Sequence, residues 1–463
     1  MYNTMKKLLL FACLLLSDAS FAQSISNRLQ FAYSKFESDS QLTNAIASLY
    51  VINAKTGDIV FDNNSRIGLP TASTLKVVTA ATAYELLGQD FRYETKFGYI
   101  GKIKGRSLSG YFYINPSGDP TLGSWRWKTT SDTSILNKFS NAIRALNIKT
   151  YGGLLINNKG WDSETIPEGW IWQDIGNYYG AGATGFNWRE NQYDVILKSG
   201  NNIGDTVSIV DTKPKFFSTH LRSFVTSAAK GSGDNAYVFY PLTKPMGFIR
   251  GTIPVNENSF AISASIPDPA REFNLLFANT ADAKWGVKEQ ALQNGSNDTT
   301  NLFTHYSPSL DSIIYWFLKK SINLYGEALV KTFAYQTNGV GETDKGLEIL
   351  KNFWKEKGIP ANELNMVDGS GLSPLNRITT HAQVMILKYA VTQPWYKAYF
   401  NAFPEYNGMK MKSGTINGVK GFCGYQKSKD GNEYIFSFLV NNYNGPSSAV
   451  VQKMYKVLDE LKN

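Results

Sequence analysis

Ser73 and Lys76 form a Ser-x-x-Lys group, a spacing that can create a nucleophile and its base. On a helix, residues three apart lie on one face, so the two side chains are within reach of each other. A lysine whose pKa is lowered by burial or nearby cations can take the serine proton, and a helix N-terminus stabilises a developing oxyanion. The same pattern occurs on exposed helices without any chemistry, so it needs support from elsewhere in the chain.

Ser321 and Asn323 form a second group, Ser-x-Asn, inside a region with helical patterning. Residues two apart project to opposite sides of a regular helix. The two side chains therefore reach a common site only if this segment is a turn between helices. The alternative is an ordinary polar break in a helix.

The third group runs from Lys412 through Ser413 and Gly414 to Thr415 on a predicted strand. Alternation places Lys412 and Gly414 on one face and the two hydroxyl residues on the other. Glycine lets a ligand backbone approach closely, lysine supplies a positive charge, and the hydroxyls can bind a carboxylate. The alternative is an exposed edge strand protected by lysines.

Periodicity outlines the elements that must position these groups. The Ala- and Leu-rich residues 73–87 predict a helix, and residues 310–333 have helical patterning throughout. Residues 410–424 and 433–442 predict a hairpin pair of strands around the turn at 429–431.

The middle of the chain has a different texture. Residues 92–266 alternate like hairpin strands and carry Gly-, Asn- and Trp-rich loops, with one helix near 132–146 for which Asp132 is the expected N-cap. The long separation of Ser73 from Ser321 leaves room for at least one complete domain. We therefore expect a catalytic domain split into 23–91 and 267–463, with an inserted β-rich module of one or two subdomains at 92–266.

Composition restricts the class of protein. The 463 residues are 43% hydrophobic and 18% charged, which is typical of an ordered globular chain. The net charge of +9 is spread without a block of like charges and without a nucleic-acid-binding motif, so no nucleic-acid partner is expected. The lysine excess suits an acidic extracytoplasmic polymer or a solvated surface equally well.

The first 22 residues have the pattern of a secretory signal peptide. Lys6 and Lys7 precede the apolar run 8–16, and Ser20 and Ala22 mark a cleavage site after residue 22. No later apolar run reaches the ~20 residues that span a bilayer. We expect an exported protein of the periplasm or cell envelope without a transmembrane helix, and contact with a membrane surface stays open.

Cysteine and histidine usage argues against a metal site or a histidine-based triad. Without the signal peptide, Cys423 is alone, so we expect no internal disulfide and a buried, unreactive thiol. His220, His305 and His381 are isolated, and no Gly-x-Ser-x-Gly elbow is present. Neither a metal nor a cofactor is expected.

The three groups occur together in an order known from active-site serine enzymes: Ser-x-x-Lys, Ser-x-Asn, then Lys-Ser/Thr-Gly. With them, the chain resembles the D-alanyl-D-alanine carboxypeptidase/endopeptidases, the class C low-molecular-mass penicillin-binding proteins. The resemblance covers nearly the whole mature chain and includes four longer stretches: Pro70-Thr-Ala-Ser-Thr-Leu-Lys, Ser117-Gly-Asp-Pro-Thr-Leu, Lys319-Lys-Ser-Ile-Asn-Leu-Tyr-Gly-Glu and Asp368-Gly-Ser-Gly-Leu-Ser.

This resemblance implies an α/β fold of the α+β type, a β-lactamase/transpeptidase-like domain with an antiparallel sheet flanked by helices. It also implies that Ser73 attacks the D-Ala-D-Ala carbonyl to form an acyl-enzyme and that Lys76 is the general base. Ser321 would relay a proton to the departing amine with help from Lys76 or Lys412.

Substrate-binding roles follow from the same resemblance. Asn323 would bind the substrate's amide, and Ser413 and Thr415 beside Gly414 would hold the terminal carboxylate together with the strand's lysine. The backbone N–H groups of Ser73 and Thr415 would form the oxyanion hole. The implied partners are peptidoglycan stem peptides and β-lactam antibiotics.

Two departures and two alternatives remain. Ile322 stands where the family often has Asp, and Ser413 where Thr is common. A serine β-lactamase is the enzymatic alternative, although it needs a deacylating base that the sequence does not reveal. A catalytically inert peptidoglycan-binding or sensor module is the other. For Asp368, capping of a turn is the favoured interpretation.

Overall fold

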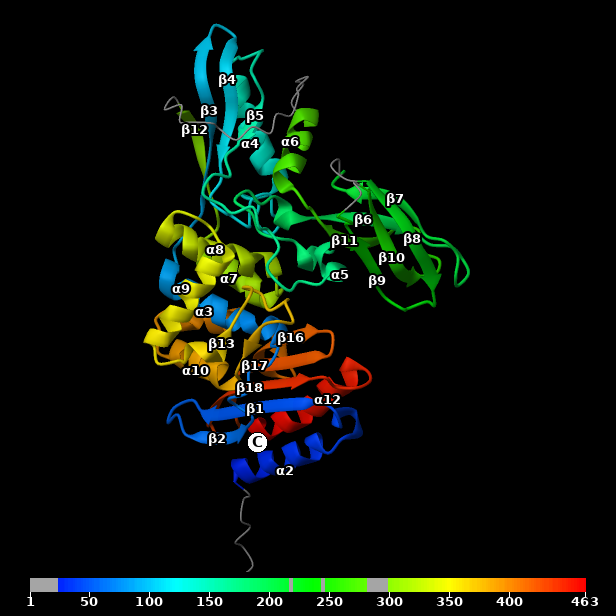
Figure 1. The fold of residues 1–463 in the computed structure, drawn as a ribbon, viewed down its shortest axis with the longest axis vertical. Coiled ribbons are helices and arrows are strands. Elements are labelled where there is room, and N and C mark those ends of the chain that lie inside the picture. Colours follow the sequence, from blue (N-terminus) through cyan, green and yellow to red (C-terminus); the bar gives the residue numbers. More distant parts are fainter. Residues whose placement is uncertain (1–23, 216–219, 243–245, 281–298) are drawn as a thin grey trace, which may run out of the picture.

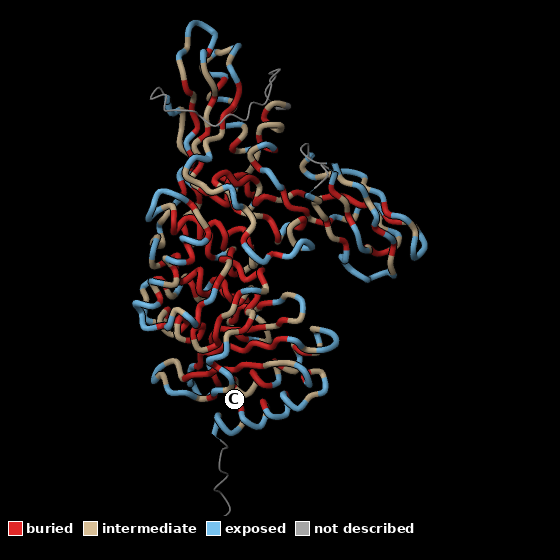
Figure 2. The backbone as a smooth tube through the Cα atoms, viewed as in Figure 1, coloured by how far each residue is buried: buried red, intermediate tan, exposed pale blue. Residues whose placement is uncertain are grey.

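The computed structural model describes residues 24–215, 220–242, 246–280 and 299–463. The expected signal peptide at 1–22 lies outside these residues. Figure 1 shows a lower body that contains both ends of the described chain, an upper lobe, and an arm that projects to one side. Buried residues are densest in the lower body (Figure 2). None of the helices in the described residues is both long and apolar enough to cross a membrane.

The lower body is built on one six-stranded sheet in which every neighbouring pair is antiparallel. N-terminal and C-terminal segments share it, because the first strand pairs along its whole length with the last one. In sheet order the strands are β15 (Glu405–Tyr406), β16 (Met409–Ile416), β17 (Val419–Lys427), β18 (Glu433–Asn441), β1 (Ile46–Asn53) and β2 (Ile59–Asn63).

Helices cover both faces of this sheet and bury an apolar cluster against each. One cluster includes residues of the terminal helices α2 (Ile25–Glu37) and α12 (Ser447–Leu458). The larger cluster on the other face includes six helices: α3 (Lys76–Leu87), α7 (Leu310–Lys319), α8 (Asn323–Asn338), α9 (Thr343–Glu356), α10 (Thr380–Val391) and α11 (Tyr396–Ala402). The predicted antiparallel sheet flanked by helices is thus confirmed.

Two element predictions in this body were wrong. Residues 310–333 are two helices, because Ser321 has φ +57, a left-handed conformation that cannot continue an α-helix. Residues 410–424 are parts of two strands, β16 and β17, joined by Asn417-Gly418 with Gly418 at φ +69. Asn-Gly between pairing strands is itself a two-residue hairpin signal. The predicted turn at 429–431 does join β17 to β18.

The inserted region has two separate apolar cores. The upper lobe contains the sheet β12-β3-β4-β5 and two helices, and the arm contains two three-stranded sheets around a second cluster. The lobe elements are β3 (Glu94–Lys104), β4 (Ser107–Asn115), α4 (Asp132–Ala145), β5 (Leu154–Ile156), α6 (Pro269–Thr280) and β12 (Thr299–Tyr306). The arm elements are β6 (Gln192–Lys198), β7 (Ser208–Lys213), β8 (His220–Ala228), β9 (Asn235–Phe239), β10 (Met246–Pro254) and β11 (Phe260–Ser265), with the short α5 (Trp172–Ile175) beside them.

The contacts of this region move its expected boundary and one helix cap. β12 pairs with β3, and α6 packs into the upper-lobe core, so both of these elements associate with the insert. We therefore propose a boundary near 306 in place of 266. Tyr93 and Ser307 exchange hydrogen bonds, so the chain enters and leaves the insert at one point. The N-cap of α4 is Ser131, whose side chain accepts from Ser134 N, and Asp132 is the first helical residue.

Candidate active site

Ser73 and Lys76 meet at the junction of a 3₁₀ turn, Ala72–Leu75, with α3. Ala72 has φ +46, a strained conformation for a residue with a Cβ, immediately before the serine. Lys76 Nζ lies 2.9 Å from Ser73 Oγ. The lysine is fully buried, and this burial, followed by the nearby charge of Lys412, lowers its pKa well below the ordinary value.

Two further acceptors hold the amine of Lys76 in place. Nζ donates to Asn323 Oδ1 at 2.6 Å and to the backbone carbonyl of Ser370 at 2.7 Å. A neutral amine has two N–H groups and one lone pair. With both N–H groups directed at these oxygens, the lone pair is free to accept the Ser73 hydroxyl proton. Sequence reasoning missed Ser370 because a backbone carbonyl leaves no signature in residue type.

The Ser-x-Asn segment meets the condition set by its spacing. The chain turns between α7 and α8, with Ser321 at φ +57 and Asn323 as the first residue of α8. The Asn323 amide bridges the two parts of the molecule, since its Oδ1 accepts from Lys76 and its Nδ2 donates to the carbonyl of Tyr179 in the insert at 2.7 Å. One Asn323 N–H remains for a ligand. Ser321 and Ser73 both line the same cleft.

Strand β16 packs directly against the turn that carries Ser73. A Cβ at Gly414 would lie 3.0 Å from Ser73 N and 2.5 Å from Thr71 O, so only glycine fits there. The predicted alternation is confirmed: Lys412 and Gly414 are buried, while Ser413 is half-buried and Thr415 exposed.

Lys412 lies beneath the cleft surface rather than along it. Its side chain is 1% exposed, and Nζ donates to Ser413 O at 2.8 Å. Burial lowers the pKa of Lys412 to about 7. Thr415 lines the cleft, and its hydroxyl accepts from Lys420 Nζ at 2.6 Å. Lys420, on the paired strand β17, therefore places near the cleft a second ammonium that the sequence did not single out.

The glycine-rich loop at 368–373 orders the floor beside Lys76. Asp368 accepts from the backbone N–H groups of Gly371 (2.7 Å) and Ser373 (2.6 Å). It also accepts from Trp170 Nε1 of the insert at 3.0 Å. The turn-capping interpretation of Asp368 is confirmed, and the carboxylate additionally ties the insert to the loop.

A buried acid beneath this loop was not predicted. Glu327 on α8 is fully buried and accepts from Gly369 N at 2.9 Å. Burial and the neighbouring Asp368 raise the pKa of Glu327 to about 8. An isolated Glu inside an apolar helical run was the signal that could have found it.

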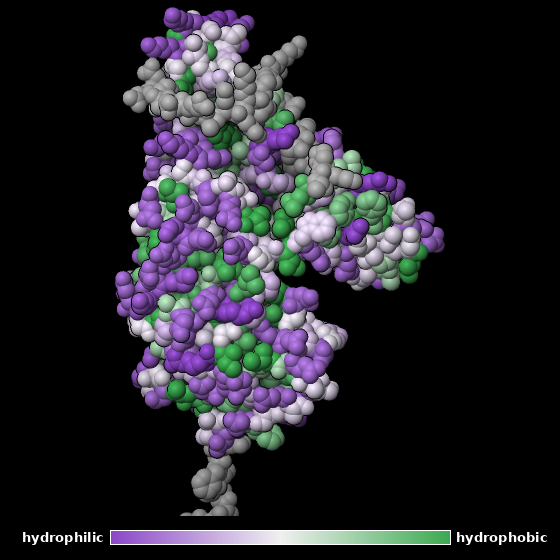
Figure 3. All heavy atoms as spheres, viewed as in Figure 1, coloured by the Kyte–Doolittle hydropathy of each residue, from purple (hydrophilic) through white to green (hydrophobic). Residues whose placement is uncertain are grey.

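Ser73 lines a cleft of about 1130 Å³ between the lower body and the insert. Figure 3 shows the hollow between the arm and the body. The insert supplies one wall, which the motif analysis missed because these residues are far from the motifs in sequence. Its lining residues include Trp125, Arg126, Ile171, Gln173, Asp174, Tyr178, Tyr179, Glu190, Gln192 and Tyr237.

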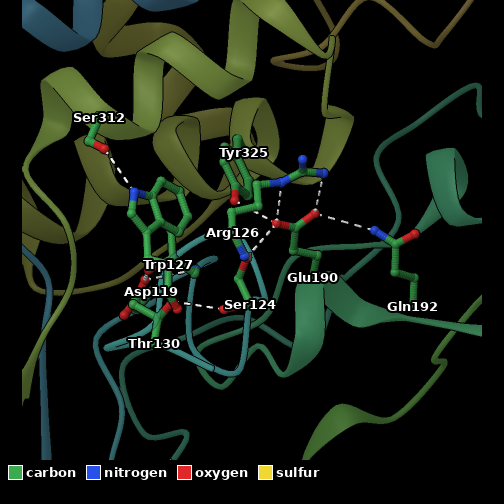
Figure 4. Close-up of polar contacts among 10 residues, drawn as sticks. Asp119, Ser124, Arg126, Trp127, Thr130, Glu190, Gln192, Ser312 and Tyr325 are labelled. Atoms are coloured by element: carbon green, nitrogen blue, oxygen red, sulfur yellow. Dashed lines mark hydrogen bonds and ion pairs between the residues drawn. The ribbon is translucent and has the colours of Figure 1, made fainter. Parts of the chain in front are cut away.

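One polar cluster fixes this wall to α8. Figure 4 shows the Glu190 carboxylate between the Arg126 guanidinium, the Tyr325 hydroxyl and Ser124. Arg126 donates through Nε (2.7 Å) and Nη2 (3.0 Å), Tyr325 at 2.8 Å and Ser124 at 2.7 Å. Arg189, Glu190 and Asn191 all have positive φ, near +50°. Buried hydrogen bonds hold this strained turn in place. The turn contacts α8 through Tyr325, which is two residues after Asn323 in the sequence.

The described residues offer little for metal or thiol chemistry. They contain no group of three His, Cys, Asp or Glu side chains that could hold a metal ion. Cys423 is fully buried in β17, and burial raises the pKa of its thiol to about 12, so it is the unreactive residue predicted from sequence.

Comparison with solved structures places the fold among the penicillin-binding proteins. The structure of penicillin binding protein 4 from Haemophilus influenzae superposes with a TM-score of 0.79 at 20% identity, covering 93% of this chain and 99% of that one. The same protein complexed with a β-lactam gives a TM-score of 0.73.

Sequence comparison defines the family. The model of the D-Ala-D-Ala carboxypeptidase 3 (S13) family matches residues 29–462. A D-alanyl-D-alanine carboxypeptidase from Actinomadura sp. strain R39 is 25% identical over 449 residues, covering 89% of this chain and 81% of the relative. A second such enzyme, from Haemophilus influenzae, is 23% identical and covers 84% of each chain. The chain belongs to the S13 family and is a peptidase.

Proposed function

We propose that this protein is an exported serine-type D-Ala-D-Ala carboxypeptidase and endopeptidase, which cleaves peptidoglycan stem peptides and cross-links through an acyl-enzyme on Ser73. The observation that carries the proposal is the buried amine of Lys76, 2.9 Å from Ser73 Oγ with its other contacts occupied by oxygen acceptors.

Acylation begins with neutral Lys76. Its lone pair accepts the hydroxyl proton as Ser73 Oγ bonds to the carbonyl carbon of the scissile amide. The backbone N–H groups of Ser73 and Thr415 stabilise the resulting oxyanion. Gly414 supports this role, because the absence of its side chain brings β16 against the backbone of Ser73.

Collapse of the tetrahedral intermediate breaks the C–N bond, and the leaving amine needs one proton. Ser321, on the same cleft, passes it from Lys76 or Lys412. Asn323 has one free N–H to hold the substrate amide, and water then hydrolyses the ester to release the shortened stem peptide and free Ser73.

Protonated Lys412, with Ser413 and Thr415, holds the terminal carboxylate of the leaving D-Ala. The pKa of Lys412, about 7 in the free protein, rises when a carboxylate binds beside it. The same contact serves the carboxylate of a β-lactam, so we propose covalent acylation by penicillin as well.

Cleavage of cross-links requires space for a second peptide beyond the scissile bond. The 1130 Å³ cleft extends along the insert well past the serine and provides that space. The amino-terminal signal pattern supports export to the periplasm or cell envelope, where peptidoglycan lies.

The test is release of D-Ala from a diacyl-D-Ala-D-Ala peptide by the mature chain, Ser73→Ala, and the cleft-lining control Ser447→Ala. We expect hydrolysis by the wild type and the control, and none by Ser73→Ala. A long-lived adduct with labelled penicillin distinguishes this enzyme from a β-lactamase, which would turn the label over rapidly. No adduct and no hydrolysis by wild type would indicate an inert binding module.

A further inference from the structure

The outer sheet of the arm has one face built from aromatic rings and arginines. Strands β8, β10 and β9 send Val225, Ile249 and Val238 into the arm's core. Residues that alternate with these lie on the opposite face. Strand pairing aligns them in two rows across the sheet: Arg222, Phe248 and Phe239 in one, and Phe224, Arg250 and Tyr237 in the other.

This face is accessible and its rings form a continuous surface. Phe224 is 51% exposed, and Trp172 of the adjoining α5 is 52% exposed. Phe239 and Phe248 are stacked with ring centroids 5.2 Å apart, and Trp172 meets Phe239 edge-on at 5.0 Å. Phe239 and Phe248 are half-buried between these exposed rings, and aromatic rings gathered at a surface in this way are typical of a binding site.

Two arginines add positive charge to this face. The guanidinium of Arg222 lies 4.9 Å from the Phe224 ring centroid, and that of Arg250 lies 5.0 Å from the Phe248 centroid. Within the described part of the chain, neither arginine forms an ion pair. Each is held over a ring with its N–H groups available to hydroxyl or carboxylate oxygens.

The face is continuous with the proposed active site. Tyr237 belongs to the second row and also lines the cleft. Trp172 stands between Ile171 and Gln173, both of which line the cleft. Its indole donates to Tyr240 O at 3.2 Å, which fixes α5 as the shared edge. Figure 1 shows α5 and β9 on the side of the arm that faces the body.

We propose that this aromatic–arginine face binds the glycan strand of peptidoglycan while a stem peptide of that strand occupies the cleft. The proposal rests on the proposed function. Pyranose rings offer C–H surfaces to aromatic rings, and their hydroxyls together with stem-peptide carboxylates complement the two arginines. A membrane surface or a second copy of the chain could use the same rings, but neither accounts for a face that leads directly into the cleft.

The test compares Phe224→Ala/Arg250→Ala with the matched control Phe31→Ala/Arg144→Ala. Phe31 is 71% exposed on α2, and Arg144 is exposed on α4, away from this face. Binding to purified, insoluble peptidoglycan is measured by co-sedimentation on a Ser73→Ala background, so that the polymer is not cleaved. We expect about tenfold weaker binding in the face variant, equivalent to roughly 1.4 kcal/mol, and no change in the control.

Small-substrate assays with Ser73 intact separate this proposal from the proposed function. The face variant should hydrolyse a diacyl-D-Ala-D-Ala peptide and react with penicillin as wild type does, because neither Phe224 nor Arg250 lines the cleft. If the wild type neither hydrolyses the peptide nor reacts with penicillin, the proposed function is wrong. The co-sedimentation experiment still tests whether the face binds peptidoglycan in that case. Arg222→Glu/Arg250→Glu, which changes only exposed side chains, provides a second variant in case the first does not fold.

Three results would overturn the proposal. The first is unchanged peptidoglycan binding in both face variants. The second is binding by wild type to anionic phospholipid vesicles, lost in the face variants, without binding to peptidoglycan. The third is a wild-type dimer in size-exclusion chromatography with light scattering that the face variants convert to a monomer.

Discussion

Replacing Lys412 should change both the size of the rate constant and its dependence on pH. Lys412→Met keeps a side chain of similar length in the buried site but removes the ammonium that the mechanism places on the substrate carboxylate. A hydrogen bond to a charged group contributes about 1.5–3 kcal/mol, so kcat/KM for a peptide ending in free D-Ala should fall by roughly one to two powers of ten.

The pH dependence is the sharper part of this prediction. Because kcat/KM reports ionisations of the free enzyme, carboxylate binding should weaken as pH rises through the Lys412 pKa of about 7. The opposite limb belongs to Lys76, which must lose its proton to act as base. The charge of Lys412 contributes to the lowered pKa of Lys76, so Lys412→Met should move this acidic limb to higher pH. In Lys412→Arg the arginine stays protonated, so the decline of kcat/KM at alkaline pH should disappear. The rate should be restored only in part, because a planar guanidinium does not replace a compact ammonium.

The assay is kcat/KM from pH 5 to 9 for a diacyl-D-Ala-D-Ala peptide and for the same peptide with a C-terminal amide. The control is Lys410→Met, on the same strand and half-buried. The variant shifts the acidic limb for both peptides, but above that limb the amide substrate should lose less of its kcat/KM, because it carries no carboxylate for Lys412 to hold. An alkaline limb near pH 7 that persists in Lys412→Arg, or an equal loss for both peptides, would refute the reasoning.

Three other perturbations follow from the same structure. Glu327→Gln should reduce the pH dependence of stability, because the raised pKa of the Glu327 carboxyl makes wild-type stability fall between pH 4.5 and about 8. The Tm measured across that pH range should therefore decline less in the variant, and an equal decline of Tm in both proteins would contradict this. Glu190→Ala should destabilise the protein by about 3–5 kcal/mol in denaturant unfolding, because it leaves the Arg126 guanidinium without its partner. Adding Arg126→Leu should recover part of this loss, and a double variant whose loss equals the sum of the two single losses would contradict the coupling of Arg126 to Glu190. Replacing 94–306 by a short Gly/Ser linker should leave a soluble lower body that reacts with penicillin more slowly, because Asn323 loses its contact with Tyr179. Replacing 92–266 instead should cause aggregation, because it exposes the face of α6 that packs into the upper-lobe core. If the 92–266 replacement were the more soluble of the two, the boundary at 266 would be supported.

Sequence reasoning reached the parts of the molecule that depend on side-chain type and local periodicity. The Ser73–Lys76 spacing predicted a contact that the geometry has, and alternation along β16 predicted which side of the strand Lys412 occupies. The hairpin turn at 429–431 could be predicted because Asp-Gly favours one type of two-residue turn.

Backbone hydrogen-bond acceptors, and the cleft wall formed by the insert, could not be predicted in this way. The carbonyls of Ser370 and Tyr179 position Lys76 and Asn323, yet any residue could supply a carbonyl. The boundary that we propose near 306 could not be read from the sequence, because α6 has the same helical period whichever core it joins, and only its packing shows that it contacts the upper-lobe core. Local pattern identifies an element but not the partner against which it is buried.

The central claim is that Ser73 is the nucleophile, and covalent labelling tests it most directly. The mature protein is incubated with penicillin, digested, and the mass of every serine-containing peptide is measured. We expect the mass of the peptide that contains Ser73 to increase by one penicillin, and we expect no adduct on any peptide of Ser73→Ala. An adduct on a peptide without Ser73, or labelling that survives in Ser73→Ala, would contradict it.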